Sequence, residues 1–146
     1  MNLYQSEEKY STIFNAVNDA IIVLDAEKHI VIDINKQAYE LFGFTRDEFV
    51  NDPFNFISDV EGGYGKELVI KYINEAQSGK PVVFEWKAKN KRGKIFWIEV
   101  QFKMVQIGLS ALLMAIVKNI DEQKKTEWSL KINEERLRMA LDASND

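Results

Sequence analysis

The chain contains no cysteine among its 146 residues. This absence excludes disulfide bridges, thiolate nucleophiles, thiolate metal sites and the cysteinyl adduct of a photoreceptor flavin. It also fits a reducing compartment, and we expect a cytoplasmic location.

Histidine is almost as scarce, because His29 is the only one. A single histidine cannot form a histidine pair or a multi-histidine metal site, so we expect no metal centre. Its position between two strand patterns predicts an exposed residue in a turn.

Long apolar runs and an excess of positive charge are also missing. The longest apolar stretch, residues 107–117, is interrupted by Gly108 and Ser110 and is too short to span a bilayer. No basic segment followed by an apolar one opens the chain. The net charge of −4 gives no electrostatic footprint for nucleic acid. We therefore expect a soluble fragment that contacts neither nucleic acid nor a membrane, while a membrane tether elsewhere in a parent protein stays open.

Apolar spacing and turn residues predict a hairpin, several short helices, one longer helix and then three strands. Asn35 is a good N-cap, Gly43 can end the same helix, and Thr45 to Glu48 form a capping box. This grouping of strands and helices indicates an α+β domain with an antiparallel sheet. The predicted helices are 3–18, two short ones that begin after Asn35 and Thr45, 65–78, and one from 121 onward; the predicted strands are 20–24, 30–34, 82–90, 94–106 and 109–118.

The end of the chain repeats its beginning. Residues 7–19 align without gaps on residues 134–146, with Glu, Glu, Ala, Asn and Asp identical. Self-similarity at a fixed offset is typical of modular arrays. We therefore predict an N-terminal flanking helix over 1–18, a domain over 19–120, a linker helix over 121–133 and the start of a truncated second module over 134–146.

The motifs, taken in order, resemble a PAS domain over roughly residues 7–125. Residues 35–49 resemble the family's segment from the second strand into the helices, with its Asn, its Gly-aromatic pair and its acidic capping position. Glu85, Gly93 and Trp97 fall where the family tends to carry these residue types, and residues 119–123 resemble its Asp-Ile-Thr exit motif. The C-terminal repeat resembles the opening of another PAS module.

The resemblance implies a five-stranded antiparallel sheet in the order 2-1-5-4-3, with short helices on one face. It also implies a sensory or dimerising role in a larger signalling protein, such as a sensor histidine kinase of a two-component system or a diguanylate cyclase. The exit motif departs from the family, because Asn119 stands for the usual Asp and Asp121 for the usual Thr. Asn119 cannot form a charged pair at the junction between domain and linker, whereas Asp121 can still cap the exit helix.

Strand alternation predicts which side chains line a pocket under the helices. The set is apolar or aromatic throughout, so it either binds a mostly apolar small ligand or fills its own core. The candidates are Ile22, Leu24, Ile32, Ile34, Phe42, Phe49, Ile57, Ile73, Trp86, Ile98, Val100, Phe102, Met114 and Ile116.

The cofactor is unknown from the sequence. A heme ligand of this family would lie on the long helix, and residues 65–78 contain no His, which argues against heme. A non-covalent flavin or another small molecule stays open, because Trp86, Trp97 and the phenylalanines could line a ring site. The glycines around Tyr64 indicate a flexible entrance to the cavity.

No spacing of polar residues indicates catalysis by the fragment itself. The carboxylates of Asp33 and Glu99 alternate with apolar residues, as on a solvated strand face. We expect a sensory module that binds a ligand or partner and signals through Asn119, Ile120 and Asp121 to downstream PAS and effector domains. The alternative is a constitutive homodimerisation module with a filled core, for which the contact candidates are Tyr10, Phe14, Val17 and Trp97.

Overall fold

The computed structural model describes residues 3–51 and 57–144, with side chains described within 7–48 and 57–144. It contains one antiparallel sheet in the order β2-β1-β5-β4-β3. This arrangement confirms the predicted α+β class and sheet order. The strands are β1 (Ala20–Asp25), β2 (Ile30–Ile34), β3 (Val82–Lys89), β4 (Ile95–Ile107) and β5 (Ser110–Asn119).

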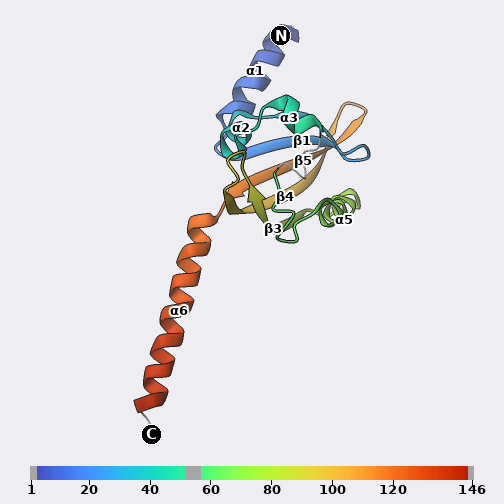
Figure 1. Ribbon diagram of the computed structural model, residues 1–146. Helices are drawn as coiled ribbons and strands as arrows, with labels where there is room; N and C mark the ends of the chain where they lie inside the picture. The colour runs from blue at the N-terminus through green and yellow to red at the C-terminus, as the bar shows by residue number, and fades with distance from the viewer. Residues whose placement is uncertain (1–2, 52–56, 145–146) are drawn as a thin grey trace.

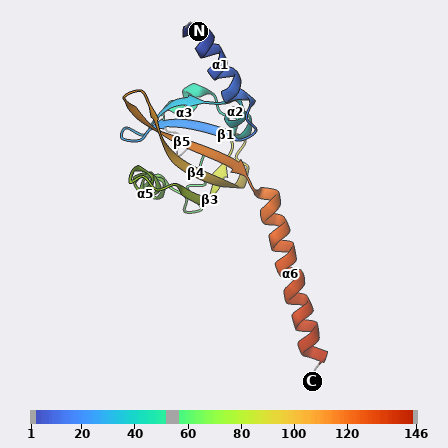
Figure 2. The same cartoon turned by 180° about the vertical axis from the view of Figure 1, so that it is seen from behind.

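Three helices cover one face of the sheet, and two others extend from the domain. Helix α2 contacts β1, α3 contacts β2, and α5 contacts β3 and β4. In Figures 1 and 2, α1 and α6 project in opposite directions, so the two ends of the chain lie far apart. The helices are α1 (Leu3–Ala16), α2 (Lys36–Phe42), α3 (Arg46–Asn51), α5 (Lys66–Gln77) and α6 (Asp121–Ser144).

The predicted capping residues define both ends of α2 and the start of α3. The Asn35 side chain accepts a hydrogen bond from the Ala38 N–H, and Gly43 adopts a left-handed conformation at φ +76° that ends the helix. The next helix begins with the predicted capping box, in which the backbone N–H and the hydroxyl of Thr45 both donate to Glu48 Oε1, at 3.2 and 3.0 Å. Local hydrogen-bonding chemistry therefore sets these boundaries.

The core lies between the sheet and its covering helices. Residues of β3 alternate between buried and exposed positions, and the apolar ones at 82, 84, 86 and 88 face inward. The same alternation holds on β4 from Phe96 to Phe102. These buried strand faces meet Val69, Ile73 and Ala76 of α5.

A β-bulge changes the inward face of β2. Val23 pairs with Asp33 and Leu24 pairs with Val31, so Ile32 is the extra residue between these pairs. Val31 and Ile34 are buried, whereas the Ile32 side chain is 39% exposed. The prediction that Ile32 faces the pocket is therefore wrong.

The C-terminal helix has no interruption between the predicted linker and the predicted second module. Helix α6 runs from Asp121 to Ser144, and none of its residues is buried. No helix in the described residues is both long and apolar enough to cross a membrane. The predicted start of a second module at 134 stays a prediction, and its last two residues lie outside the described ranges.

Candidate functional site: the core cavity and the exit junction

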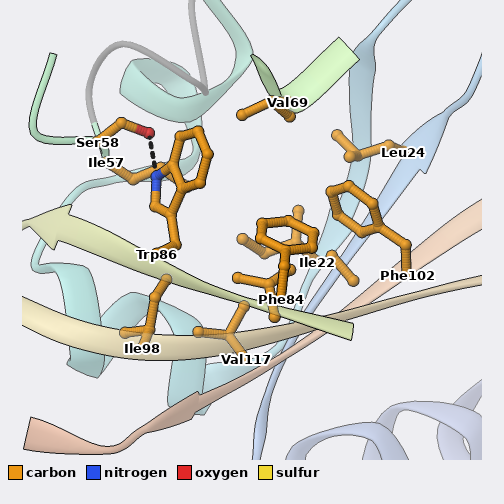
Figure 3. A pocket seen from close by; sticks show the side chains of 12 residues that line it. Ile22, Leu24, Ile57, Ser58, Val69, Phe84, Trp86, Ile98, Phe102 and Val117 are labelled. Atoms are coloured by element: carbon orange, nitrogen blue, oxygen red, sulfur yellow. Dashed lines mark hydrogen bonds between the residues drawn. The ribbon is translucent and has the colours of Figure 1, made fainter. Parts of the chain in front are cut away.

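A small apolar cavity lies between the inner face of the sheet and α5 (Figure 3). Its volume is about 40 Å³, close to the space that one water molecule occupies in the liquid. Eleven of its twelve described lining residues are apolar or aromatic. The lining residues are Ile22, Leu24, Ile57, Ser58, Val69, Phe84, Trp86, Ile98, Val100, Phe102, Ala115 and Val117.

Ser58 supplies the one hydroxyl of this described lining, and its oxygen acts there as an acceptor. The Trp86 indole N–H donates to Ser58 Oγ at 2.9 Å, as the dashed line in Figure 3 marks. Ser58 itself forms a bridge with Ala88 at the edge of β3. This hydrogen bond therefore fixes Trp86 in the cavity wall, and the other described lining residues are apolar or aromatic.

The aromatic side chains of the wall form one connected cluster. The Tyr72 ring stacks on Phe84, with centroids 3.9 Å apart and an angle of 5°. Phe84 makes edge-to-face contacts with Trp86 at 5.7 Å and with Phe102 at 5.1 Å. The two edge-to-face contacts lie in the favourable range for aromatic pairs, and the close packing of all four rings means that a displacement of one affects the others.

A flavin does not fit this described lining. Pockets that hold ligands of this size usually measure about 300–1,000 Å³ and contain several placed polar groups. The present cavity is far smaller, and its hydroxyl is bonded to Trp86. Heme is equally unsupported, because His29 lies in the β1–β2 turn at φ +58° and not on α5.

The exit from the domain is a hydrogen-bonded junction between β4 and α6. The Ile120 N–H donates to the Trp97 carbonyl oxygen at 3.0 Å, and the Trp97 N–H donates to Asp121 Oδ1 at 3.2 Å. The Asp121 N–H in turn donates to Asn119 Oδ1 at 2.9 Å. Ile120 is only 4% exposed, so its side chain anchors the start of α6 in the domain.

Charge at this junction comes from Lys124 and Asp121. Lys124 forms an ion pair with Glu85 and lies over the Trp97 ring, with Nζ 5.2 Å from the centroid. The hydrogen bond to Glu85 raises the pKa of Lys124. The backbone hydrogen bond from Trp97 lowers the pKa of Asp121, and Lys125 at 3.3 Å adds to this effect.

A sequence model of the PAS domain family matches residues 18–122. The chain belongs to the PAS domain family. PAS domains are sensory modules, and the match covers the whole sheet and the first residues of α6.

Curated relatives of this PAS domain are sensor proteins. The methyl sulfide methyltransferase-associated sensor of Methanosarcina acetivorans is 24% identical over 92% of the chain. The blue-light-activated histidine kinase of Brucella ovis is 30% identical over 60% of the chain. The chain spans only 13% and 17% of the lengths of these two relatives.

Solved structures share the PAS fold at low identity. The chain of an RNA-binding light-oxygen-voltage receptor has a TM-score of 0.73 and 16% identity, with 92% of this chain and 39% of that chain covered. The PAS domain of an HTR-like protein from Haloarcula marismortui has a TM-score of 0.69 and 18% identity, with 81% and 94% covered.

The PAS cavity brings together half of the residues that strand alternation predicted. Ile34, Phe42 and Ile73 are buried in the same core without lining the cavity. The Phe49 side chain lies outside the described residues. The predicted lining residues that the structure places at the cavity are Ile22, Leu24, Ile57, Trp86, Ile98, Val100 and Phe102.

Two further predicted pocket residues lie on the opposite face of the PAS sheet. Ala115 pairs with the inward-facing Ile22, so its neighbours Met114 and Ile116 face outward. The prediction for Met114 and Ile116 is therefore wrong.

Sequence reasoning also missed five lining residues of the PAS cavity. Phe84 could have been found, because it lies two residues from Trp86 on the same strand face. Val69 has helical spacing to Ile73, which is the pattern of a shared helix face. Ser58 carries no local signal, since its role depends on the distant Trp86. The missed residues are Ser58, Val69, Phe84, Ala115 and Val117.

The predicted dimer contacts of the PAS domain lie in two separate places. On α1, Tyr10 is 51% exposed, stacks on Phe14 and donates to Asp33 Oδ2 at 3.5 Å. Val17 follows α1 and is exposed. Trp97 lies on the outer sheet face, where Lys124 and Lys87 both lie over its ring.

Proposed function

We propose that this chain is a sensory PAS module whose input changes the packing of the cavity wall and whose output leaves through α6. The supporting observation is the position of Trp97 on β4. Its neighbours Phe96 and Ile98 are buried in the core, while its own backbone exchanges hydrogen bonds with Ile120 and Asp121. A change in the inward face of β4 therefore acts on the residues that hold the exit helix.

The input in this proposal is a small apolar or aromatic molecule, or a protein partner that deforms the same wall. Among its described residues, the lining offers apolar contacts and one hydroxyl, that of Ser58, whose oxygen accepts from Trp86. Because the cavity measures only about 40 Å³, a ligand would bind a conformation in which wall residues have moved. Such a ligand shifts the population toward that conformation by its differential affinity.

An engineered cavity tests this transmission without knowledge of the natural ligand. Phe102→Ala removes a buried ring, and apolar cavities made in this way can bind benzene. Cysteines introduced at the exposed Lys80 and Arg138 can carry spin labels, because the chain has no other cysteine. An excess of unlabelled protein ensures that the measured distances are those between two labels on the same chain.

Benzene is expected to change the distance distribution between the labels in Phe102→Ala and to leave the unmodified cavity unaffected. The NMR signal of the Trp86 indole N–H reports whether benzene occupies the cavity. Occupancy in the variant without any change in the label distances contradicts transmission through α6.

We further propose that the module works inside a longer signalling protein, with a following PAS module and an effector. Two considerations support this: the relatives are several times longer, and they are named as a sensor and a histidine kinase. A histidine kinase is therefore the first effector to test, and a diguanylate cyclase is the second. Autophosphorylation by the full-length protein with ATP, or cyclic di-GMP formation from GTP, distinguishes the two.

A constitutive dimerisation module is the second candidate function. Its support is the nearly filled core together with the exposed apolar side chains of α6. Leu130 and Leu137 are seven residues apart and exposed, as two a positions of a heptad would be, and Asn133 would then be a polar d position that sets the register at some cost in stability. Tyr10, Phe14 and Val17 on the entry side offer a second apolar contact for the partner copy.

Light scattering at increasing concentration tests the dimer. Leu137→Glu is expected to dissociate it, while Arg138→Glu introduces the same side chain one position away and leaves it intact. A monomer at all concentrations contradicts the dimerisation module. A dimer of Phe102→Ala whose label distances do not change when benzene binds favours it over the sensory module.

A further inference from the structure

Tyr64 lies at the edge of the sheet, in contact with one residue of the cavity wall and one residue of the exit junction. Its ring makes an edge-to-face contact with Trp86 at 5.1 Å and 74°, and another with Trp97 at 6.0 Å and 86°. Trp86 faces the core, whereas Trp97 pairs with Lys87 and shares the outer face. One side chain therefore contacts residues of both sheet faces.

The sheet order explains how Tyr64 can reach both faces. Strand β3 is the edge strand, and the segment before Tyr64 docks along it. The Asp59 N–H donates to the Lys87 carbonyl oxygen at 3.0 Å, and the Lys89 N–H donates to the Ile57 carbonyl oxygen at 3.0 Å. Since the described residues contain no strand beyond this segment in the sheet, Tyr64 can pack around the edge.

The backbone of Tyr64 is held, while its sequence neighbours contribute no side chains. The Tyr64 N–H donates to the Asp59 carbonyl oxygen at 3.1 Å, and Gly63 adopts φ +99° immediately before it. With Gly63 and Gly65 on either side, the ring position depends on its contacts with the two tryptophans. A displacement of either tryptophan therefore changes the contacts that position this ring.

From these contacts we infer that Tyr64 is a positioning residue that couples the cavity to α6 around the edge of β3. The route runs from Phe84 through Trp86 and Tyr64 to Trp97, whose ring lies under Lys124 of α6. Lys124 is itself tied to Glu85 of β3 by an ion pair. This role of Tyr64 rests on the proposed transmission from the cavity to α6. It adds a route through side chains at the sheet edge to the path along the β4 backbone.

The chain offers a matched control for Tyr64. Tyr72 is another half-buried tyrosine that contacts the cavity cluster, through its stacking on Phe84. Its ring contact is with Phe84, on the inner face of β3. Tyr64→Leu and Tyr72→Leu thus each remove a tyrosine ring that contacts the same cluster. Only Tyr64→Leu removes the contact that joins Trp86 to Trp97. Tyr64→Phe retains the ring and serves as the conservative rescue.

Phe102→Leu provides the cavity perturbation, because Phe102 contacts the cluster and is five residues from Trp97 along β4. The response is read from the chemical shifts of the Trp97 indole N–H and of the backbone N–H groups of Ile120 and Lys124. If Phe102→Leu does not fold, Val100→Ala perturbs the same wall with a smaller change.

We expect Phe102→Leu to shift the junction signals in the wild-type background. With Tyr64→Leu the shifts should fall to less than about half, and with Tyr64→Phe or Tyr72→Leu they should persist. Equal shifts with Tyr64→Leu overturn the inference and leave the proposed function standing, with β4 as the route. Equal losses with Tyr72→Leu also overturn it, since they indicate a general effect of core disruption. An absent response in the wild-type background contradicts the proposed function and the inference together.

Discussion

Asn35 joins three elements of the fold, and its replacement by Ala is expected to be among the most destabilising single substitutions. Its side chain is fully buried and makes four hydrogen bonds. The oxygen accepts from the backbone N–H groups of Ile21 at 2.8 Å and Ala38 at 3.1 Å. The amide donates to the carbonyl oxygens of Phe14 at 3.1 Å and Asp19 at 3.0 Å.

The magnitude follows from what Asn35→Ala leaves behind. Each lost hydrogen bond costs about 1 kcal/mol, and buried groups left without a partner cost about 1–3 kcal/mol each. Ala38 keeps a second acceptor, the Asn35 carbonyl oxygen at 3.2 Å, which reduces the loss at that group. We therefore expect a decrease of about 3–5 kcal/mol in the free energy of unfolding, a large part of the stability of a typical domain.

Asn35→Asp separates the two halves of this interaction. The carboxylate retains the acceptors for Ile21 and Ala38 but loses both donors, and it faces the carbonyl oxygens of Phe14 and Asp19. We expect a decrease in stability at least as large as that of Asn35→Ala, because a buried negative charge then lies against two carbonyl oxygens, together with faster amide exchange in α1.

Urea unfolding followed by circular dichroism measures these changes, with hydrogen exchange for α1. Asn18→Ala is the control, because Asn18 is exposed and the same substitution there should change stability by less than about 0.5 kcal/mol. A decrease below about 1 kcal/mol for Asn35→Ala refutes the reasoning. A clearly smaller decrease for Asn35→Asp than for Asn35→Ala refutes the expected cost of the buried negative charge.

Three further perturbations test other parts of the molecule. Ile73→Ala empties a fully buried site on α5 and should lower the free energy of unfolding in urea by about 2–5 kcal/mol, whereas a loss under about 1 kcal/mol contradicts the tight packing. Gly62→Ala places a Cβ against the Asp59 carboxylate and should lower stability by about 1–2 kcal/mol, and an unchanged urea midpoint contradicts this. Because the pKa of Asp121 is lowered in the folded state, its stabilisation is present above the ordinary carboxyl pKa of about 3.9 and is lost as the pH falls through the lower folded value. Amide exchange at Trp97 should accelerate in that acidic range in the wild type, and Asp121→Asn, which cannot ionise, should lack this pH dependence.

The sequence predicted those features of the fold that depend on local chemistry. The caps at Asn35, Gly43 and Thr45 are each defined within a few residues, so their interpretation needed no knowledge of the tertiary structure. The alternating pattern of β3 likewise identifies its inward face, because apolar and polar residues alternate from Phe84 to Lys89.

The wrong pocket predictions concern residues for which the local sequence pattern does not show which side of the sheet the side chain faces. Residues 111–117 of β5 are all apolar, so alternation cannot say whether Ala115 or Ile116 points inward; pairing with β1 decides this. On β2 the bulge exchanges the face of Ile32, and a bulge is a property of two paired strands. The Ser58–Trp86 hydrogen bond and the two ring contacts of Tyr64 join residues distant in sequence, so they emerge only from the three-dimensional structure.

Helix α6 has a mechanical consequence that follows from its length and from its attachment to the domain at one end. Its 24 residues extend about 36 Å at 1.5 Å per residue, and none of them is buried. It therefore acts as a lever whose pivot lies at Ile120 and the Trp97 backbone. A tilt of about 5° at this pivot displaces the far end by about 3 Å, which exceeds half of one helical turn. Sub-ångström changes at the β4 end of the sheet can thus become displacements large enough to alter the packing of whatever follows Ser144.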